Sequence, residues 1–314
     1  MKVSLVVPCY NEEEMIYEFY KETKRVFEDK VESYEFVFVN DGSKDKTLEI
    51  LKAIHKISDN VKVVSFSRNF GKEAAMYAGL SNATGDYTCV IDADLQQRPE
   101  VVLEMMQILD SEPDVDCVAA YQAERKEGKG INFLKGGFYK FINKISEVEF
   151  YPGASDFRMM RRKMVDEVVK LTEYYRFSKG LFSFVGFNTK FIPYEVQERA
   201  AGVSKWSVIK LFRYAIEGFV GYTTAPLKFA TFTGFAMIVS AFIYLVVALI
   251  VGIINASLTA TVAIITLILF IGGLQFIFLG IIGEYLARTY MQGKNRPVYI
   301  TKEILTYEEE KEEE

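Results

Sequence analysis

Short apolar runs alternate with amphipathic segments along the first third of the chain. Buried strands are expected over residues 3–7, 36–39, 61–66, 87–91 and 115–120. Between them, apolar residues at helical spacing predict helices over 12–27, 46–57, 72–83 and 100–109. Strands and helices that alternate in this way, joined by short turns, predict a mostly parallel sheet flanked by helices on both faces. The fold class is therefore α/β.

Two later runs, 229–254 and 258–283, contain no charged residue. Each is about 26 residues long, and about 20 apolar residues are enough for a helix to cross the hydrocarbon core of a membrane. A core helix of a soluble protein, the alternative, rarely stays uncharged on every face over such a length. Because only residues 255–257 separate the runs, we expect a hairpin of two transmembrane helices.

Basic residues flank this hairpin on both sides, with Lys210, Arg213 and Lys228 before it and Arg288 and Lys294 after it. Since cytoplasmic flanks are enriched in Lys and Arg, both termini are expected in the cytoplasm. Residues before the hairpin have helical apolar spacing, which predicts a helix in the membrane interface or, alternatively, one packed on the soluble domain. The predicted organisation is a soluble domain over 1–204, a juxtamembrane amphipathic helix over 205–226, the hairpin over 227–284 and a C-terminal segment over 285–314.

Composition argues against several classes of function. The formal net charge is -5 and basic residues are scattered, which argues against nucleic acid as a partner. His55 is the only histidine, which argues against a histidine-based zinc site or a Ser-His-Asp triad. Cys9, Cys89 and Cys117 lie in or beside apolar runs and are expected to be buried, reduced thiols.

Polar residues follow four of the predicted strands. These are Tyr10–Glu12, Asp41–Ser43, Arg68–Asn69 and Asp92–Asp94. Ligands of open α/β sheets bind beyond the carboxyl ends of the strands. The four groups are therefore expected to line one binding edge, although Asn11 at a helix start and residues 40–43 in a turn also have structural readings.

Asp92 and Asp94 form the strongest chemical signal. Two carboxylates at the end of a buried strand can share a hard divalent cation, Mg²⁺ or Mn²⁺, which commonly keeps phosphate oxygens among its ligands. Such a cation neutralises the charge of a departing diphosphate. A solvated acidic turn is the alternative.

Three motifs occur together in order: P-C-Y-N-E at 8–12, N-D-G-S-K-D at 40–45 and D-A-D-L-Q at 92–96. As a set they resemble the inverting family 2 glycosyltransferases with the GT-A fold, over about the first 205 residues. The resemblance implies metal ligands at Asp92, Asp94 and Gln96. It also implies contacts to the nucleotide-sugar from Pro8, Tyr10, Glu12, Asp41, Arg68, Lys72 and Asp92.

The segments 65–75, 155–160, 176–181 and 199–206 narrow the resemblance to polyprenyl-phosphate glycosyltransferases, a group that includes dolichol-phosphate mannose synthases and bacterial bactoprenol glycosyltransferases. It implies a bacterial plasma-membrane enzyme that moves a hexose, glucose or N-acetylglucosamine, from a UDP-sugar to undecaprenyl phosphate for cell-envelope glycosylation. It further implies a homo-oligomer, a tetramer in bacterial relatives.

The acceptor phosphate of such an enzyme is largely anionic at neutral pH, because its second pKa is about 6. It therefore needs little help from a base. Asp156 matches the family position of a base or positioning group, and we favour the positioning role. Asp156 and Asp94 are thus the two residues expected to be catalytic. A structural ion pair of Asp156 with Arg158 or Arg161 is the alternative.

Basic residues near the predicted membrane surface are candidates for holding the acceptor phosphate: Arg125, Lys129, Arg199 and Lys205. Relatives often have a serine in the loop where this chain has Gly136–Gly137, so the assignment within the loop stays open, with Lys126 and Lys135 also basic. A solvated loop, or contact of Lys205 with anionic lipid, are the alternatives.

Two rival functions remain at this point. A processive polysaccharide synthase would share the sheet and the acidic pair, but it carries a Q-x-x-R-W motif that residues 197–200 do not match. A non-catalytic membrane scaffold would not need Asp92, Asp94 and Gln96.

Overall fold

The computed structural model describes residues 1–122, 143–144, 148, 151, 153–195, 229, 232–233, 236, 239–240, 243 and 260–306. The chain divides into two compact units. One comprises Met1–Ala215 together with Pro297–Glu314, and the other comprises Ile216–Arg296.

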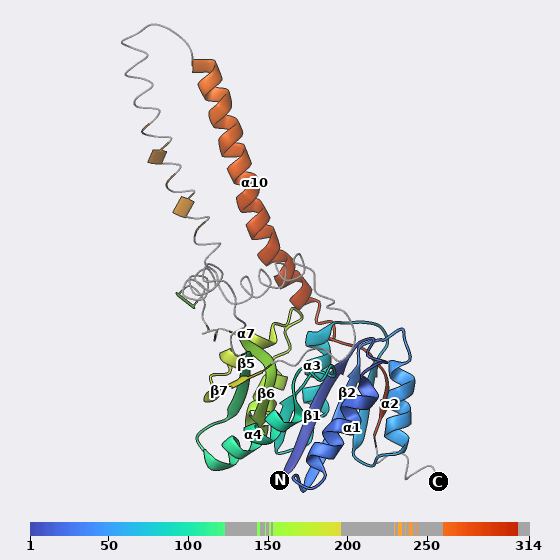
Figure 1. The fold of residues 1–314 in the computed structure, drawn as a ribbon. Coiled ribbons are helices and arrows are strands. Elements are labelled where there is room, and N and C mark those ends of the chain that lie inside the picture. Colours follow the sequence, from blue (N-terminus) through green and yellow to red (C-terminus); the bar gives the residue numbers. More distant parts are fainter. Residues whose placement is uncertain are drawn as a thin grey trace. The chain divides into compact units, whose positions relative to one another are not determined.

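The first unit is built on an eight-stranded sheet with the order β7-β5-β6-β4-β1-β2-β3-β8 (Figure 1). Its strands are β1 (Lys2–Cys9), β2 (Ser33–Asn40), β3 (Val61–Phe66), β4 (Tyr87–Val90), β5 (Cys117–Gln122), β6 (Ala154–Arg161), β7 (Thr189–Tyr194) and β8 (Thr301–Leu305). β1 pairs in parallel with β2 and β4, and β2 pairs in parallel with β3. β6 and β8 run antiparallel to their neighbours. The predicted mostly parallel α/β sheet is confirmed.

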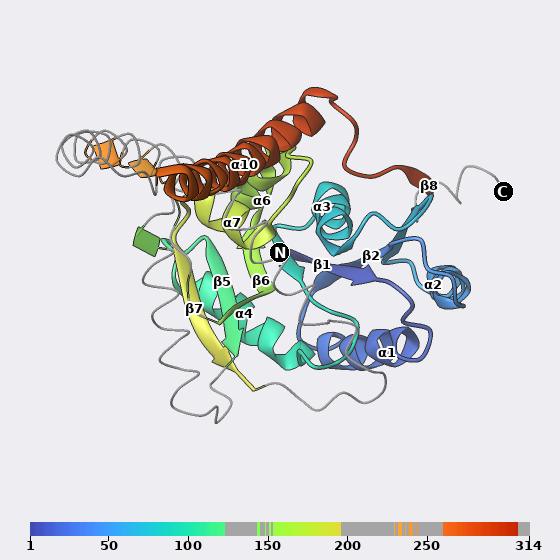
Figure 2. The same ribbon diagram turned by 90° about the horizontal axis from the view of Figure 1, so that it is seen from above.

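Helices cover both faces of this sheet, as Figure 2 shows from above. One face carries α1 (Ile16–Phe27), α2 (Thr47–Lys56) and α4 (Pro99–Ser111), and the other carries α3 (Lys72–Asn82), α6 (Arg162–Lys170) and α7 (Ser178–Phe184). Successive strand residues point to opposite faces, so Leu5 and Val7 join the core under α1 while Val6 joins the core under α3. β1 is therefore buried on both faces, which explains why its residues are mostly apolar.

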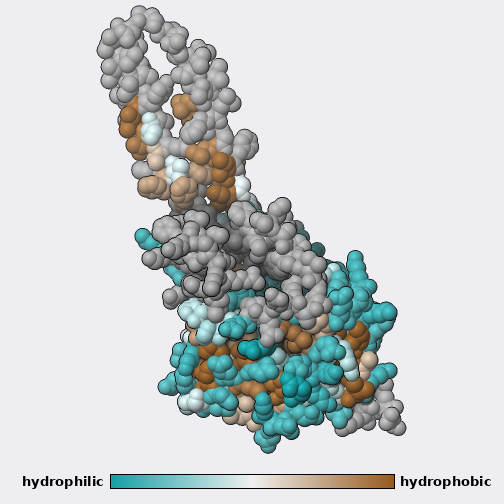
Figure 3. All heavy atoms as spheres, viewed as in Figure 1, coloured by the Kyte–Doolittle hydropathy of each residue, from teal (hydrophilic) through white to brown (hydrophobic). Residues whose placement is uncertain are grey.

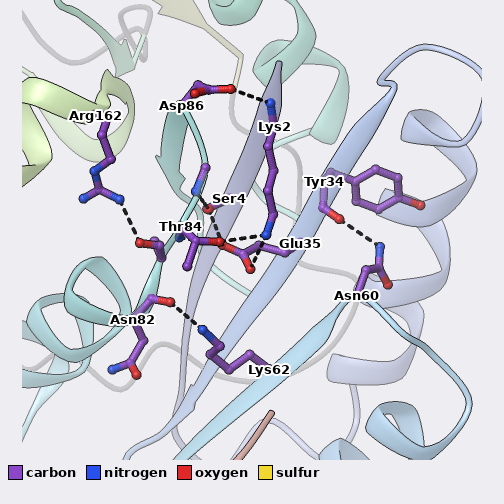
Figure 4. Close-up of polar contacts among 12 residues, drawn as sticks. Lys2, Ser4, Tyr34, Glu35, Asn60, Lys62, Asn82, Thr84, Asp86 and Arg162 are labelled. Carbon is purple, nitrogen blue, oxygen red and sulfur yellow. Dashed lines mark hydrogen bonds and ion pairs between the residues drawn. The ribbon is translucent and has the colours of Figure 1, made fainter. Parts of the chain in front are cut away.

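The amino ends of the strands are held by buried polar contacts around Glu35 (Figure 4). This carboxylate accepts hydrogen bonds from Ser4 Oγ (2.5 Å), the Thr84 N–H (2.7 Å) and Lys2 Nζ (3.0 Å). Burial alone would raise the pKa of Glu35, but these hydrogen bonds outweigh it and hold the pKa below its ordinary value. A Cβ on Gly85 would lie 2.8 Å from Ser4 Oγ, so the close approach of this turn requires glycine. This end of the sheet is structural.

Several element boundaries differ from the sequence-based expectation. The helix expected from Glu12 begins at Ile16, because residues 12–15 form a turn in which the Met15 N–H donates to the Glu12 carbonyl at 3.1 Å. β6, β7 and β8 were not expected. β8 is supplied by residues beyond the predicted hairpin.

The second unit contains α10 (Ala260–Gly293), which covers the predicted run 258–283 from residue 260 onward. Glu284 is the first charged residue of α10, and the described side chains of Ile268, Ile277 and Leu279 are 63%, 59% and 61% exposed. Figure 3 shows hydrophobic side chains at the surface of this unit. Judged by length and hydropathy, however, none of the helices in the described part of the chain qualifies as a membrane span. The two predicted spans are thus not confirmed, and both the juxtamembrane helix and most of 229–254 lie outside the described residues.

Candidate active site

The carboxyl ends of β1, β2 and β4 meet at one edge of the sheet because these strands are neighbours and parallel. β6 runs antiparallel beside β4, with Val90 opposite Arg158. Continued by two residues, this register places Asp156 opposite Asp92. The antiparallel strand therefore brings a third carboxylate to the edge where β4 delivers the acidic pair.

Lys72, the first residue of α3, joins these carboxylates. Its Nζ lies 2.7 Å from Asp92 Oδ1 and 3.5 Å from Asp156 Oδ2. Burial lowers the pKa of Lys72, but the charges of Asp92 and Asp156 outweigh burial and raise it above its ordinary value. Lys72 is therefore a permanent cation between the two carboxylates.

Asp156 is partly satisfied. Its Oδ1 is buried and has no hydrogen-bond partner in the part of the chain that the structure describes. Burial raises the pKa of this carboxyl, yet the charges of Lys72, Lys179 and Arg158 dominate and hold it below its ordinary value. The Arg161 guanidinium donates instead to the carbonyls of Val115 (2.8 Å) and Leu109 (2.6 Å). Asp156 is thus ionised, and its side chain is 17% exposed at the sheet edge although Oδ1 itself is buried.

Asp92 is positioned by Gln97, whose role the sequence did not reveal. The Asp92 N–H donates to Gln97 Oε1 at 2.9 Å, and Gln97 Nε2 donates to Asp92 Oδ2 at 3.3 Å. Since a backbone N–H only donates, the amide oxygen of Gln97 must face it, which leaves the amide nitrogen for the carboxylate. Gln97 is 6% exposed, so it acts as an internal support.

Asp94 lies in a tight turn after β4. Its Oδ1 accepts a hydrogen bond from the Gln96 N–H at 3.1 Å, and Leu95 between them has a φ of 57°. A non-glycine residue in this left-handed region is uncommon and is associated with turns and functional sites. Asp94 is two residues from Asp92 in the sequence, and its role as a metal ligand stays a prediction.

Asp41 is buried and holds the loop 68–71. Its carboxylate accepts hydrogen bonds from the Phe70 N–H (2.6 Å), Asn69 Nδ2 (2.8 Å) and the Gly71 N–H (3.0 Å). Burial raises the pKa of Asp41 despite these hydrogen bonds. At Gly42, φ is 60° and a Cβ would lie 2.3 Å from the Arg68 carbonyl carbon, so the turn requires glycine. Asp41 therefore orders the loop that carries Arg68.

Arg68 is exposed, and its guanidinium lies 3.9 Å above the ring of Phe70. The guanidinium also donates from Nη1 to the Asn69 carbonyl at 2.9 Å. Stacking and this hydrogen bond hold a cation at the edge of the sheet, with the side chain still exposed.

The turns after β1 and β2 are tied together. The Asn11 N–H donates to Ser43 Oγ at 3.0 Å, and Asn11 Oδ1 accepts from the Lys44 N–H at 2.9 Å. The Glu12 N–H donates to Thr47 Oγ1 at 2.8 Å. Asn11 consequently does not cap α1, which was its structural alternative; it links two loops, and it leaves Pro8 and Tyr10 partly exposed.

The 176–181 segment connects α7 to α3 through two contacts. The Ser178 N–H donates to Glu73 Oε2 at 2.8 Å, and the Arg176 guanidinium lies 4.2 Å above the ring of Tyr77. These contacts therefore hold α3, the helix that begins at Lys72.

The four predicted acceptor residues lie outside the described residues: Arg125, Lys129, Arg199 and Lys205. Their alternatives in the same loop, Lys126 and Lys135, lie outside as well.

The oxygen ligands available at this edge of the sheet fit a hard divalent cation in part. Asp92 and Asp94 offer carboxylate oxygens, the ligands that Mg²⁺ and Mn²⁺ prefer. Within the described ranges no group of three or more His, Cys, Asp or Glu side chains could hold a metal ion. A cation here would have to complete its ligands from the substrate, as Mg²⁺ commonly does with phosphates.

The family model described as Glycosyl transferase family 2 matches residues 4–169, a range that includes the carboxyl ends of β1, β2 and β4 and all of β6. The chain belongs to glycosyl transferase family 2. This membership confirms the predicted enzyme class and the GT-A-like α/β fold, and it excludes the non-catalytic scaffold as the best reading.

Family 2 relatives match this glycosyltransferase over nearly its whole length. A prophage bactoprenol glucosyl transferase homolog of Escherichia coli (strain K12) is 40% identical over 306 residues, covering 97% of this chain and 99% of the relative. The bactoprenol glucosyl transferase of Shigella phage SfII is 39% identical over 307 residues, covering 96% and 98%.

Among solved structures, glucosyl-3-phosphoglycerate synthase from Mycobacterium tuberculosis, in complex with Mn²⁺, UDP-glucose and phosphoglyceric acid, aligns with a TM-score of 0.45 at 19% identity. The alignment covers 68% of this chain and 76% of that one.

Proposed function

We propose that this family 2 glycosyltransferase transfers a hexose, glucose or N-acetylglucosamine, from a UDP-sugar to undecaprenyl phosphate with inversion. The cluster of Lys72, Asp92 and Asp156 beside Asp94 is the observation that carries the proposal. Relatives named bactoprenol glucosyl transferases, similar over almost the full chain, support the lipid acceptor.

On the donor side, Asp92, Asp94 and Gln96 would hold Mg²⁺ or Mn²⁺, which when bound neutralises the charge of the leaving UDP. Lys72 and Arg68 contribute fixed positive charge to the same diphosphate. The nucleoside contacts Pro8, Tyr10, Glu12 and, through the loop it orders, Asp41.

On the acceptor side, a phosphate oxygen attacks the anomeric carbon as the bond from that carbon to the UDP oxygen breaks. Attack from the opposite face converts an α-linked donor into a β-linked product. Because the phosphate oxygen is already anionic, Asp156 positions the reacting sugar and need not remove a proton. Its side chain is 17% exposed, so the carboxylate can accept a hydrogen bond from a sugar hydroxyl.

A carrier with a long lipid tail stays in the bilayer, so the enzyme must work at its surface. The uncharged runs 229–254 and 258–283 would anchor the chain as a hairpin in the bacterial plasma membrane, with the catalytic domain and both termini cytoplasmic. Arg125, Lys129, Arg199 and Lys205 would bind the lipid phosphate, and the enzyme would assemble as a homo-tetramer.

The test is a donor panel with mass spectrometry of the lipid product. Purified full-length protein is incubated with undecaprenyl phosphate, Mg²⁺ or Mn²⁺, and either UDP-glucose or UDP-N-acetylglucosamine. We expect one glycolipid that carries a single hexose, and none from undecaprenol, which lacks the phosphate. A polymer would favour the polysaccharide synthase, and no product from either donor would contradict the proposal.

A further inference from the structure

The residues that follow α10 return to the first unit and complete its sheet. β8 pairs antiparallel with β3, and the Ser67 N–H donates to the Ile300 carbonyl at 3.0 Å, just past the end of β3. Lys52 on α2 forms an ion pair with Glu303 at 2.7 Å. The C-terminal segment 298–305 is therefore an integral part of the catalytic unit.

An aromatic contact path leads from this segment toward the candidate site. The Tyr299 ring stacks on Phe66 with centroids 4.8 Å apart and an interplanar angle of 18°. Phe66 in turn meets the edge of Phe70 at 5.7 Å and 89°. Phe66 is 2% exposed, so Tyr299 covers a face that is closed to solvent in the folded protein.

The path ends on Asp41. The Phe70 N–H donates to Asp41 Oδ1 and the Gly71 N–H to Asp41 Oδ2. The loop 68–71 has no regular secondary structure, so its conformation depends on Asp41 on one side and the Phe66–Phe70 contact on the other. Lys72 follows the loop directly, which makes the position of its ammonium group sensitive to the same contacts.

We propose that the C-terminal segment 298–305 positions the donor-binding loop 68–71, with Tyr299 as the positioning residue. Tyr299 supports Phe66, and through Phe66 and Phe70 it fixes Arg68 and the start of α3. The inference rests on the proposed function to the extent that the loop binds the sugar nucleotide.

The test compares Tyr299→Ala with Tyr299→Phe in the full-length protein, and Lys302→Gln, at an exposed position of the same segment, serves as a control. Two readouts are used: hydrogen exchange of the Phe70 and Gly71 amides without substrate, and the KM for UDP-sugar beside kcat. Tyr299→Leu keeps apolar volume without the ring and replaces Tyr299→Ala if the alanine variant does not fold.

In Tyr299→Ala or Tyr299→Leu we expect faster exchange at both amides and a donor KM raised about fivefold, the size that loss of an aromatic pair supports, with kcat changed less. Tyr299→Phe, which keeps the ring, and Lys302→Gln should match the wild type in both readouts. Unchanged exchange at Phe70 and Gly71 would overturn the positioning role itself. Faster exchange with an unchanged donor KM would overturn the assignment of the loop to the donor, and would leave the proposed lipid transfer to be judged by the donor panel.

Discussion

At the scale of single residues, the centre of the site is one cation between two carboxylates. Lys72 neutralises part of the charge that Asp92 and Asp156 bring to the sheet edge, and without it the two carboxylates would repel one another. A cation fixed in this way is ready to meet the diphosphate of a donor without reorganisation.

Replacing Lys72 with methionine keeps the length of the side chain and removes the charge. We expect kcat/KM to fall about 100-fold, a typical cost of losing one fixed electrostatic contact in an active site, while the protein stays folded. Lys62→Met is the matched control, because Lys62 Nζ donates to the Asn82 carbonyl and takes no part in the cluster. A Lys72→Met rate within twofold of the wild type would remove Lys72 from the mechanism.

Gln97→Met tests whether the hydrogen bonds of Gln97 hold Asp92 in position. The substitution leaves the Asp92 N–H without its partner, which costs about 1–3 kcal/mol, and frees the carboxylate to rotate. We expect a higher divalent-ion concentration for half-maximal rate, measured by metal titration of initial rates. Gln107→Met, at an exposed position of α4, should leave this concentration unchanged; an unchanged value in Gln97→Met would show that the support is dispensable.

The sequence located the acidic pair but not its support. A D-x-D after an apolar strand is visible because the carboxylates and the strand are adjacent in the chain. In the sequence Gln97 looks like an ordinary polar loop residue. Its contact with Asp92 is visible only in the folded structure. Lys72 was assigned to the nucleotide-sugar, whereas its contact with Asp156 depends on the antiparallel pairing of β6, which no local pattern indicates.

At the scale of elements, the two ends of the parallel strands have different tasks. The carboxyl ends carry the site, while at the amino ends Glu35 ties β2 to β1 and to the turn before β4 through Ser4 and Thr84. Because Glu35 is 1% exposed, its hydrogen bonds are shielded from water and contribute to the stability of the sheet.

Glu35→Ala should lower the free energy of unfolding by about 3 kcal/mol, since buried donors lose their acceptor. The pH dependence follows from the lowered pKa of Glu35 in the folded protein. Its contribution is present above the unfolded-state pKa of about 4.3 and is lost as the pH falls through the lower folded-state value. Chemical denaturation across acidic pH measures this.

In Glu35→Gln the acid-dependent part of the loss should disappear, leaving a flatter profile than that of the wild type. Glu32→Gln, whose side chain is 88% exposed, should reproduce the wild-type profile. A Glu35→Gln profile as steep as the wild type would assign the acid sensitivity to other groups.

The sequence pattern predicted the parallel core of the sheet well, because β1 to β4 are largely buried on both faces and consist mostly of apolar residues. It missed β6 and β8 for physical reasons. β6 carries the charged residues Asp156, Arg158 and Arg161, which interrupt an apolar pattern. β8 is a five-residue edge strand of alternating exposure, far along the chain from its partner β3.

At the scale of the whole molecule, one chain combines a family 2 catalytic unit with a second unit whose sequence is largely uncharged. The catalytic unit needs residues from both sides of that second unit, because β8 comes after it. An experiment on anchoring must therefore retain residues 297–306.

Replacing residues 227–296 with a flexible Gly/Ser linker tests the proposed anchor. Activity on a soluble, short-chain polyprenyl phosphate should largely persist, whereas activity on undecaprenyl phosphate in vesicles should fall about 100-fold, because confinement at the surface raises the effective concentration of the lipid. Transfer rates with both acceptors provide the measurement. Equal losses on the two acceptors would contradict the anchoring role.

The most direct test of the site is transfer of labelled sugar from the UDP-sugar to undecaprenyl phosphate by wild type and Asp94→Ala, with thermal unfolding as the control for folding. Asp94 is partly exposed, so the substitution should leave the fold intact. We predict that Asp94→Ala unfolds like the wild type and transfers sugar at least about 100-fold more slowly. A folded Asp94→Ala protein with a near-normal rate would contradict the account.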